Sequence, residues 1–374
     1  MLNPKQIYFD YNATAPCLTP VKDAMYDIMS NPLNPSSLHT YGRNSRFIID
    51  TARSRISELL GASDNYQVIF TSTGTESNNT ALLGMRGYKL LTSEVEHQSV
   101  LKVVGKGEIT VDKNGIVEMD VLEHLLASSQ QPVLVSIQFA NSETGVIQPI
   151  AEITKLVHKY NGLMHTDAAQ AFGRVPFSIS EYDIDLLTIT GHKFGGPVGA
   201  SALILKKSLP LQPLMRGGGQ EMRFRSGTQN VAAIHGFGIA AEIVASTMNS
   251  FAYVSEIRDY IEEEIIKIAP EVTVFGKNAP RLPNTSSISM PGISNETQVI
   301  FFDINGVAVS SGSACSSGRV DLPYVQMAMG YSEEIARTSL RISLGINNTI
   351  VEAKEFIVLW KQLYLKSNEL IKAA

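Results

Sequence analysis

Residues able to bind an anion follow the first of several short apolar segments that we interpret as buried strands. After residues 67–72 comes TSTGTESNNTALLG (71–84), a glycine-containing turn that leads into a predicted helix. The first turn of a helix has free backbone N–H groups and the positive end of the helix dipole, and both attract anions. Thr75 and Ser77 add hydroxyl donors. The stretch indicates either a phosphate-binding turn or an ordinary N-cap.

Acid–base and nucleophilic side chains follow two further predicted strands. They are Asp167 and Gln170 in HTDAAQ (165–170), and Thr190, His192 and Lys193 in TITGHKFGGP (188–197). A lysine in a partly desolvated site can lose its proton and form a Schiff base. The alternatives are a solvated lysine and an aspartate in a strand-end turn.

His97 in EVEHQSV (94–100) and Arg341 in LRISLG (340–345) are weak signals when each is taken alone. Together with the anion-binding turn, Asp167 and Lys193, they form the set that a pyridoxal 5'-phosphate (PLP) site requires. The lysine forms the Schiff base, and the aspartate keeps the pyridine nitrogen protonated so that the ring acts as an electron sink. The arginine binds a substrate carboxylate through two parallel hydrogen bonds.

A cysteine, Cys315, stands among small residues in VSSGSACSSG (309–318), and the only other cysteine is Cys17. The loop thiol is either incidental or carried to a site that needs it. Two cysteines form no disulfide framework, and neither lies in a metal-type pair such as C-x-x-C. We therefore expect free thiols, no metal site and a cytoplasmic protein.

The elements that must position these residues alternate between strand and helix. Predicted strands are 67–72, 88–93, 132–140, 163–169, 185–190 and 200–206, and predicted helices include 44–61, 150–160, 254–268 and 350–372. Alternation of this kind favours an α/β fold with a mainly parallel sheet covered on both faces. In open α/β sheets ligands bind beyond the carboxyl ends of the strands, where the candidate residues stand. After about residue 250 the pattern indicates a smaller α+β domain.

Composition excludes several classes of protein. The chain has 374 residues, is 44% hydrophobic and has a net charge of -5. An acidic balance does not favour nucleic acid or an anionic membrane surface. The N-terminal residues do not have the pattern of a secretory signal, and no apolar run approaches the roughly 20 residues of a membrane-spanning helix. We expect neither nucleic acid nor membrane as a partner.

The motifs resemble those of cysteine desulfurases of the NifS/IscS type, within the class V aminotransferases. The matching strings, in family order, are FDYNATAP, GTESNN, EHQSV, ETGVIQPI, DAAQAFG, the HK pair, RSGT, SSGSAC and RISLG. The resemblance implies the PLP-dependent transferase fold (fold type I) with a mainly parallel seven-stranded sheet. It implies a large domain over 15–250, a small domain made of 1–14 and 251–374, and a homodimer.

The resemblance also implies a role for each site residue. Lys193 is expected to bind the cofactor covalently, Asp167 to contact the pyridine nitrogen, Gln170 the ring hydroxyl, and His97 to stack on the ring and move protons. Thr75, Thr190 and His192 are expected at the phosphate, with Thr228 reaching the phosphate in the partner subunit. Arg341 is expected to bind the cysteine carboxylate and Cys315 to accept sulfur as a persulfide.

One departure from the family pattern concerns residues 141–145, NSETG, where the family usually has Asn-Asn-Glu. Ser142 falls where the family has an asparagine that contacts the cofactor and the substrate carboxylate. A serine hydroxyl has a shorter reach than an amide. Either Ser142 substitutes or Asn141 shifts into the position.

The resemblance predicts removal of sulfur from L-cysteine, giving L-alanine and a persulfide on Cys315. The sulfur would pass to an unidentified acceptor protein, for iron–sulfur cluster assembly or tRNA thiolation. A selenocysteine lyase would use the same cofactor site. An aminotransferase of this class would not need Cys315, and a non-catalytic scaffold would not need Lys193 or Asp167.

Overall fold

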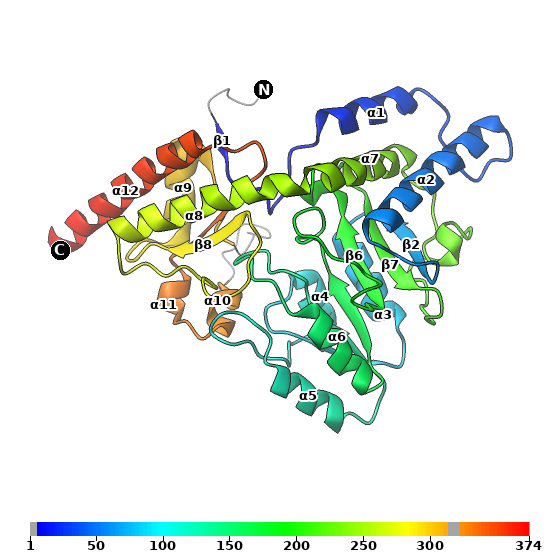
Figure 1. Cartoon of the computed structure of the whole chain (residues 1–374), viewed down its shortest axis with the longest axis horizontal. Coiled ribbons are helices and arrows are strands. Elements are labelled where there is room, and N and C mark those ends of the chain that lie inside the picture. The colour runs from blue at the N-terminus through cyan, green and yellow to red at the C-terminus, as the bar shows by residue number, and fades with distance from the viewer. Residues whose placement is uncertain (1–5, 313–321, 374) are drawn as a thin grey trace.

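A computed structural model describes residues 6–312 and 322–373 of the chain. Cys315 therefore lies outside the described residues. Figure 1 shows a larger part built around strands such as β6 and β7, and a smaller part that contains β8, α9 and α12. The long helix α8 (Phe251–Ile268) runs from the larger part into the smaller one.

The larger part contains a mixed sheet with the strand order β2-β7-β6-β5-β4-β3. The strands are β2 (Tyr66–Thr71), β3 (Lys89–Thr92), β4 (Val133–Ser136), β5 (Leu163–Asp167), β6 (Leu186–Thr190) and β7 (Ser201–Lys206). Strands β3 to β6 are mutually parallel, whereas β7 is antiparallel to both of its neighbours. All six strand predictions and the α/β class are confirmed.

The seven-stranded sheet is a correction, because the described residues form six strands in this sheet. The segment beside β3 pairs only through a single bridge between Ser93 and Ile109. Strand β7 is antiparallel because the connection from β6 holds only one short 3-10 turn, η1 (Gly191–Lys193). A parallel return needs a crossover of a dozen or more residues.

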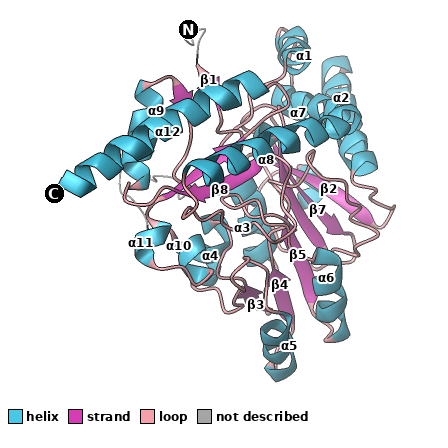
Figure 2. Ribbon diagram, turned by 60° about the vertical axis from the view of Figure 1, so that its left-hand side comes forward, coloured by secondary structure: helices cyan, strands magenta, loops and turns pink. Residues whose placement is uncertain are grey.

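Helices cover both faces of this sheet, as Figure 2 shows for the magenta strands. Alternate strand residues point to opposite faces, so that Val68 and Phe70 join one buried cluster and Ile69 joins another. The first cluster includes residues of α2 (Thr40–Leu59), α5 (Met119–Ser128), α6 (Ile150–Lys159) and α7 (Val231–Thr247), and α1 (Thr19–Met29) packs on α7. The second includes residues of α3 (Gly74–Gly84) and α4 (Gln98–Val104).

The smaller part has its own hydrophobic cluster. Its elements are β1 (Ile7–Tyr8), β8 (Thr285–Ser289), α9 (Asn295–Ile304), β9 (Val307–Ala308), α10 (Tyr324–Ala328), α11 (Glu333–Ala336), β10 (Ser339–Ser343) and α12 (Ile350–Ala373). The cluster joins Ile7 and Phe9 to buried residues between 254 and 364, although Phe275 and Leu282 pack into the larger part. The predicted domain limits stay a prediction.

The helical stretch Val231–Ile268 corrects one expectation from the sequence. It contains an 18-residue window with a mean hydropathy of 1.5, long and apolar enough to cross a membrane by length and composition. Because 56% of that window is buried inside the protein, it has the character of a core helix. Gly238 allows this packing, since a Cβ atom there would lie 2.7 Å from the Ala52 Cα of α2.

Candidate active site

Residues far apart in the sequence meet at the carboxyl ends of the parallel strands. Asp167 ends β5, Lys193 lies in η1 directly after β6, and His97 follows β3. Arg341 comes from β10 of the smaller part. The charges of Arg341 and Asp167 both affect the pKa of Lys193. The structure thus brings together residues that the sequence predicted separately.

The Lys193 side chain is largely withdrawn from water. Its Nζ donates hydrogen bonds to the backbone oxygens of Asn12, at 2.5 Å, and Ala13, at 2.9 Å. Burial, together with the cations Arg341 and Arg174, lowers its pKa to about 7. Near neutral pH a large share of the amine is unprotonated, which is the form that attacks a carbonyl carbon.

Asp167 lies in a buried hydrogen-bond chain that ends at His97. Its Oδ2 accepts from Asn78 Nδ2 at 2.7 Å, and its Oδ1 accepts from the Ala169 N–H at 2.9 Å. The same Asn78 amide donates to Ser99 Oγ at 2.8 Å, and this hydroxyl contacts His97 Nδ1 at 2.7 Å. Sequence reasoning missed Asn78, although it stands in the GTESNN string.

His97 caps helix α4 and is held in one tautomer. Its Nδ1 accepts the backbone N–H of Ser99 at 3.1 Å. Burial lowers the pKa of His97, and the charge of Lys193 acts in the same direction. The neutral ring therefore has its proton on Nε2 and can donate from that atom.

The N-terminus of α3 is the predicted anion-binding turn. Thr73 caps the helix by accepting the Glu76 N–H at 3.0 Å, and Thr75 is exposed in the first turn. A Cβ atom at Gly74 would lie in ordinary van der Waals contact with Thr190, 3.7 Å from its Cβ, so this turn and the end of β6 are close neighbours. Ser77 is a correction: its hydroxyl is buried and pairs with Thr71 at 2.6 Å, so it cannot serve as an anion donor.

The other predicted cofactor residues have partners that orient them. Thr190 Oγ1 accepts from Ser201 Oγ at 2.7 Å. His192 Nδ1 lies 3.3 Å from Thr14 Oγ1, and burial lowers the pKa of this histidine to about 4, so it is neutral. Gln170 is buried and donates from Nε2 to the Asn12 oxygen at 3.0 Å.

Arg341 has an unused donor. Its Nη2 donates to Asp10 Oδ1 at 2.7 Å and its Nη1 to the Ser142 oxygen at 3.2 Å. Its buried Nε has no hydrogen-bond partner within the described residues. Because an unsatisfied buried donor is costly, the guanidinium is suited to receive a carboxylate.

The structure separates the two alternatives for residues 141 and 142. Asn141 Oδ1 accepts the N–H groups of Glu143 and Thr144, each at 2.9 Å, and its Nδ2 donates to the Val95 oxygen at 3.0 Å. Its amide is therefore engaged in the turn and is not shifted toward Arg341. Ser142 is half-buried beside Arg341, and a substrate contact by Ser142 stays a prediction.

Comparison with known proteins places the chain in a family. The profile of the Aminotransferase class-V family matches residues 7–356. The chain belongs to this family. It is 38% identical to a cysteine desulfurase IscS of Dictyoglomus turgidum, over 92% of this chain and 91% of the relative. A NifS-like protein from Rickettsia africae has a TM-score of 0.90 and 37% identity, covering 96% of this chain and 99% of that protein.

A second similar structure is that of SspA in complex with cysteine. Its TM-score is 0.76 and its identity is 30%, over 92% of this chain and 100% of that protein. These similarities extend over nearly the whole class V aminotransferase chain, so they concern both of its parts.

Class V aminotransferase enzymes of this kind use PLP, and the residues present fit that cofactor. Lys193 offers an amine with a pKa of about 7. Asp167 offers a carboxylate in an oriented, buried position. The N-terminus of α3 offers free backbone N–H groups to an anion, and Gly74 places no side chain between this turn and Thr190. Together these groups can hold the ring, the aldehyde carbon and the phosphate.

Among the described residues, one predicted residue, Thr228, is not joined to this cluster. Thr228 is exposed on the loop between η2 (Glu221–Arg223) and α7. Nearby Arg225 contacts the first turn of α3 through Glu76, at 2.8 Å. Cys315 belongs to the residues that the structure does not describe, so its predicted role stays a prediction.

Proposed function

We propose that the protein is a PLP-dependent cysteine desulfurase that converts L-cysteine to L-alanine and retains the sulfur as a persulfide on Cys315. The observation that carries this proposal is that the Lys193 amine and the Arg341 guanidinium serve the same site. The buried Nε of Arg341 has no hydrogen-bond partner among the described residues. One group acts on the amino end of an α-amino acid and the other binds its carboxylate. The sulfur specificity is supported by the similarity to cysteine desulfurases over about nine-tenths of the chain.

The cofactor, when bound, supplies an electron sink that makes bonds at Cα and Cβ of the substrate labile. Lys193 holds the proton taken from Cα, because its pKa of about 7 lets its amine accept and return a proton near neutral pH. Asp167 would stabilise positive charge on the ring nitrogen of the cofactor, because Asn78 holds its carboxylate in place. The N–H on Nε2 of His97 would be available as a proton donor beside the cofactor.

Arg341 fixes the orientation of the substrate. Asp10 and the Ser142 oxygen hold two of its N–H groups, and this leaves Nε and the remaining donors for a carboxylate. A carboxylate bound in two-pronged geometry has a defined direction, so the β-sulfur of L-cysteine points consistently to one side of the site.

The thiolate of Cys315 attacks the sulfur of the substrate. A sulfur–sulfur bond forms as the Cβ–S bond breaks, and the electron pair of that bond returns to carbon, which takes up a proton. The net change converts cysteine and a thiol into alanine and a persulfide. The thiolate is the reactive form of cysteine, and the small residues around Cys315 suit a segment that must move.

The products of the reaction test this proposal. The purified protein with PLP, L-cysteine and a reductant should release L-alanine and sulfide in equal amounts. Cys315→Ala should lose sulfide release while the cofactor absorbance remains, and Cys17→Ala, the matched control, should behave as the parent. Pyruvate and ammonia in place of alanine, or full activity of Cys315→Ala, would contradict the proposal.

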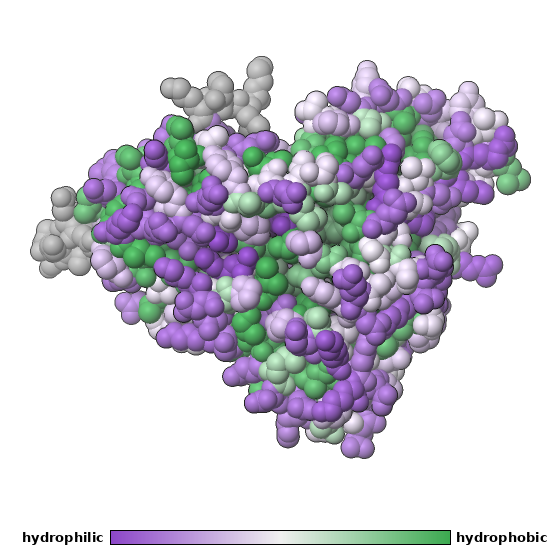
Figure 3. Space-filling model, viewed as in Figure 1, coloured by the Kyte–Doolittle hydropathy of each residue, from purple (hydrophilic) through white to green (hydrophobic). Residues whose placement is uncertain are grey.

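We also propose a homodimer in which Thr228 reaches the phosphate of the other subunit. Thr228 is exposed, and large exposed apolar residues gather on the same part of the molecule: Tyr26, Met29, Leu38, Tyr41, Phe47 and Met222. Figure 3 shows green apolar residues among the polar ones over α1 and α2. An exposed apolar surface of this kind is typical of an association face.

Subunit mixing tests the homodimer. A heterodimer of Lys193→Ala and Thr228→Ala subunits contains one intact site if Thr228 acts across the interface, and none if it acts within its own subunit. Recovery of activity on mixing two weakly active variants is the expected result. A monomer by light scattering, or no recovery from a verified heterodimer, would contradict it.

The persulfide sulfur is expected to pass to an acceptor protein of iron–sulfur cluster assembly or tRNA thiolation. A cytoplasmic location, where thiols stay reduced, suits a reactive cysteine. Transfer of labelled sulfur from L-cysteine to candidate acceptors tests the first expectation.

A further inference from the structure

Arg174 is a buried cation whose hydrogen-bond partners are all uncharged. Its Nη1 donates to Asn12 Oδ1 at 2.7 Å and to Gln170 Oε1 at 2.6 Å. Its Nη2 donates to the backbone oxygens of Tyr11, at 3.3 Å, and Lys193, at 3.1 Å. The side chain is 4% exposed, and none of the ion pairs within the described residues includes it.

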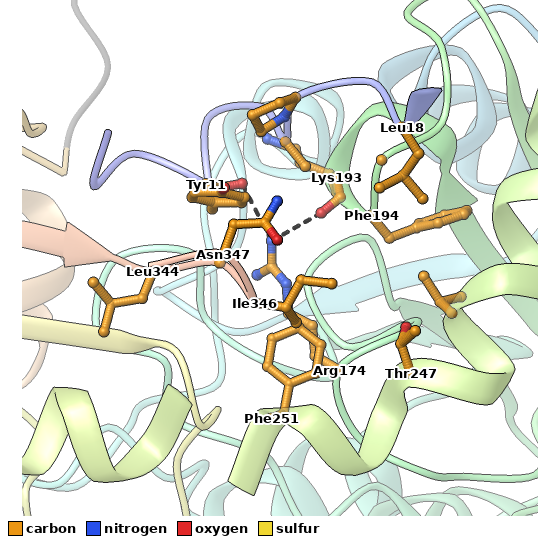
Figure 4. A pocket seen from close by; sticks show the side chains of 16 residues that line it. Tyr11, Leu18, Arg174, Lys193, Phe194, Thr247, Phe251, Leu344, Ile346 and Asn347 are labelled. Carbon is orange, nitrogen blue, oxygen red and sulfur yellow. Dashed lines mark hydrogen bonds between the residues drawn. The ribbon is translucent and has the colours of Figure 1, made fainter. Parts of the chain in front are cut away.

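These four acceptors come from three separate segments that surround the reactive lysine. Tyr11 and Asn12 belong to the N-terminal turn, Gln170 follows β5, and Lys193 follows β6. Figure 4 shows the guanidinium of Arg174 between the Tyr11 and Lys193 segments. Only a planar fork with several donors can contact acceptors in so many directions at once.

The N-terminal turn that Arg174 holds also receives the reactive amine. The Asn12 oxygen accepts both Lys193 Nζ and Gln170 Nε2. A displacement of Asn12 would therefore move the acceptors of Lys193 and of Gln170 together. We propose that Arg174 is a positioning residue that clamps the Tyr11–Ala13 turn to η1 and thereby sets where the Lys193 amine and the Gln170 amide lie.

Stability alone does not explain a guanidinium at this position. A buried charge without a countercharge is costly, and an apolar or neutral residue of similar size is often better tolerated. Its surroundings are largely apolar. The cavity beside it is lined in part by Leu18, Phe194, Val244, Phe251, Leu344 and Ile346. Low local polarity strengthens the action of its charge on Lys193.

The charge of Arg174 acts together with other groups that face the lysine. Burial comes first among the causes that lower the pKa of Lys193, followed by the charges of Arg341 and Arg174, whereas Asp167 and Asp10 raise it. The pKa values of His97 and His192 are lowered, mainly by burial, and the charge of Lys193 also lowers them. Arg174 is thus one of two cations that favour the unprotonated amine.

Two variants separate the geometry of Arg174 from its charge. Arg174→Lys keeps the charge but loses the fork, so we expect PLP to bind about tenfold more weakly while the amine titrates at its original midpoint. Arg174→Gln also removes the charge, so the midpoint should rise by about one pH unit. Both are measured on the full chain, as the equilibrium dissociation constant of PLP and as the pH dependence of Lys193 labelling, followed by mass spectrometry without cofactor.

Arg281→Gln is the matched control, because Arg281 is also a buried arginine and pairs with Glu262 at 2.7 and 2.9 Å, away from Lys193. It should destabilise the fold but leave both the PLP affinity and the labelling midpoint unchanged. The decision rests on Arg174→Lys, which retains the buried charge: PLP affinity within twofold of the parent would overturn the proposal. The proposal rests on PLP binding at Lys193, and failure of the parent chain itself to bind PLP would instead contradict the proposed function.

Discussion

The two ends of the candidate site differ in how completely their polar groups are paired. At the lysine end, Asn12 uses its backbone oxygen, its amide and its N–H, and it contacts Lys193, Gln170, Arg174, Ser142, Thr285 and Ser343. At the anion end, the first turn of α3 keeps N–H groups without intrahelical partners, as any helix start does, and Thr75 is exposed. The polar groups of Asn12 are therefore paired before any ligand binds, whereas the first turn of α3 still has donors to offer.

This difference indicates how substitutions at the two ends should act. Removing a partner at the lysine end leaves buried polar groups unsatisfied, so the free energy of unfolding should fall. Filling space at the anion end should weaken cofactor binding with little effect on unfolding. The reaction itself depends on one group at the lysine end, the Lys193 amine.

The largest effect is expected from Lys193→Ala. This change removes the amine that acts on both the cofactor and the substrate, so alanine formation should fall by at least roughly 10³-fold. Borohydride should fix no PLP on the variant, as measured by mass spectrometry. Lys207→Ala, at an exposed lysine, is the control and should give the normal adduct. A normal adduct on Lys193→Ala would show that another lysine is the reactive one.

The next largest effect is expected on the free energy of unfolding, from a substitution at the lysine end. Asn12→Ala leaves Arg174, Asn284 and the Ser142 oxygen without one partner each. The free energy of unfolding of the cofactor-free chain should fall by about 3 kcal/mol, as measured by denaturant titration. Asn31→Ala is the control, since that exposed side chain makes a single hydrogen bond, of 3.4 Å. Equal free energies of unfolding for the two variants would show that the hydrogen bonds of Asn12 do not stabilise the lysine end.

A smaller effect is expected from Gly74→Ala at the anion end. The added methyl group would lie against Thr190, 3.7 Å from its Cβ, and would crowd the turn where the phosphate is expected, so PLP should bind roughly tenfold more weakly. Unfolding should be unchanged or slightly harder, because alanine favours a helix over glycine. Leu83→Ala, at an exposed position of the same helix, should leave the PLP affinity as it is. A loss of stability without a loss of affinity would contradict this prediction.

The smallest effect concerns the buried carboxyl of Glu96. Ser93 Oγ and the Gln138 N–H donate to its two oxygens, at 2.6 and 2.8 Å, and burial raises its pKa to about 8. Between its ordinary pKa, near 4.5, and about 8, the folded chain retains a proton that the unfolded chain has lost, so stability falls as pH rises through this window.

Glu96→Gln removes that titration. The decline in the unfolding temperature between pH 5 and pH 8 should become shallower by a few degrees, as measured by calorimetry of the cofactor-free chain. Glu334→Gln, at an exposed glutamate, should leave the slope unchanged. The same slope in the parent and in Glu96→Gln would show that Glu96 is already ionised in the fold.

Much of the candidate site could be predicted because its residues directly follow strands. Asp167 and Lys193 stand at such positions, and parallel strands bring their carboxyl ends to one edge of a sheet. The direction of β7 and the number of strands could not be predicted from the sequence, because strand pairing depends on contacts between distant segments. The turn role of Asn141 depends on local backbone hydrogen bonds that no residue pattern specifies.

The sequence by itself determined the α/β order of elements, the type of cofactor and the candidates Lys193, Asp167, His97 and Arg341, because residue types and strand-end positions are local properties. The tertiary structure decided which of these groups become buried, and therefore how strongly each holds its proton. It also decided the hydrogen bonds that Arg174 and Asn12 make around Lys193. Several of these contacts join residues more than 150 positions apart, and they exist only after the chain has folded.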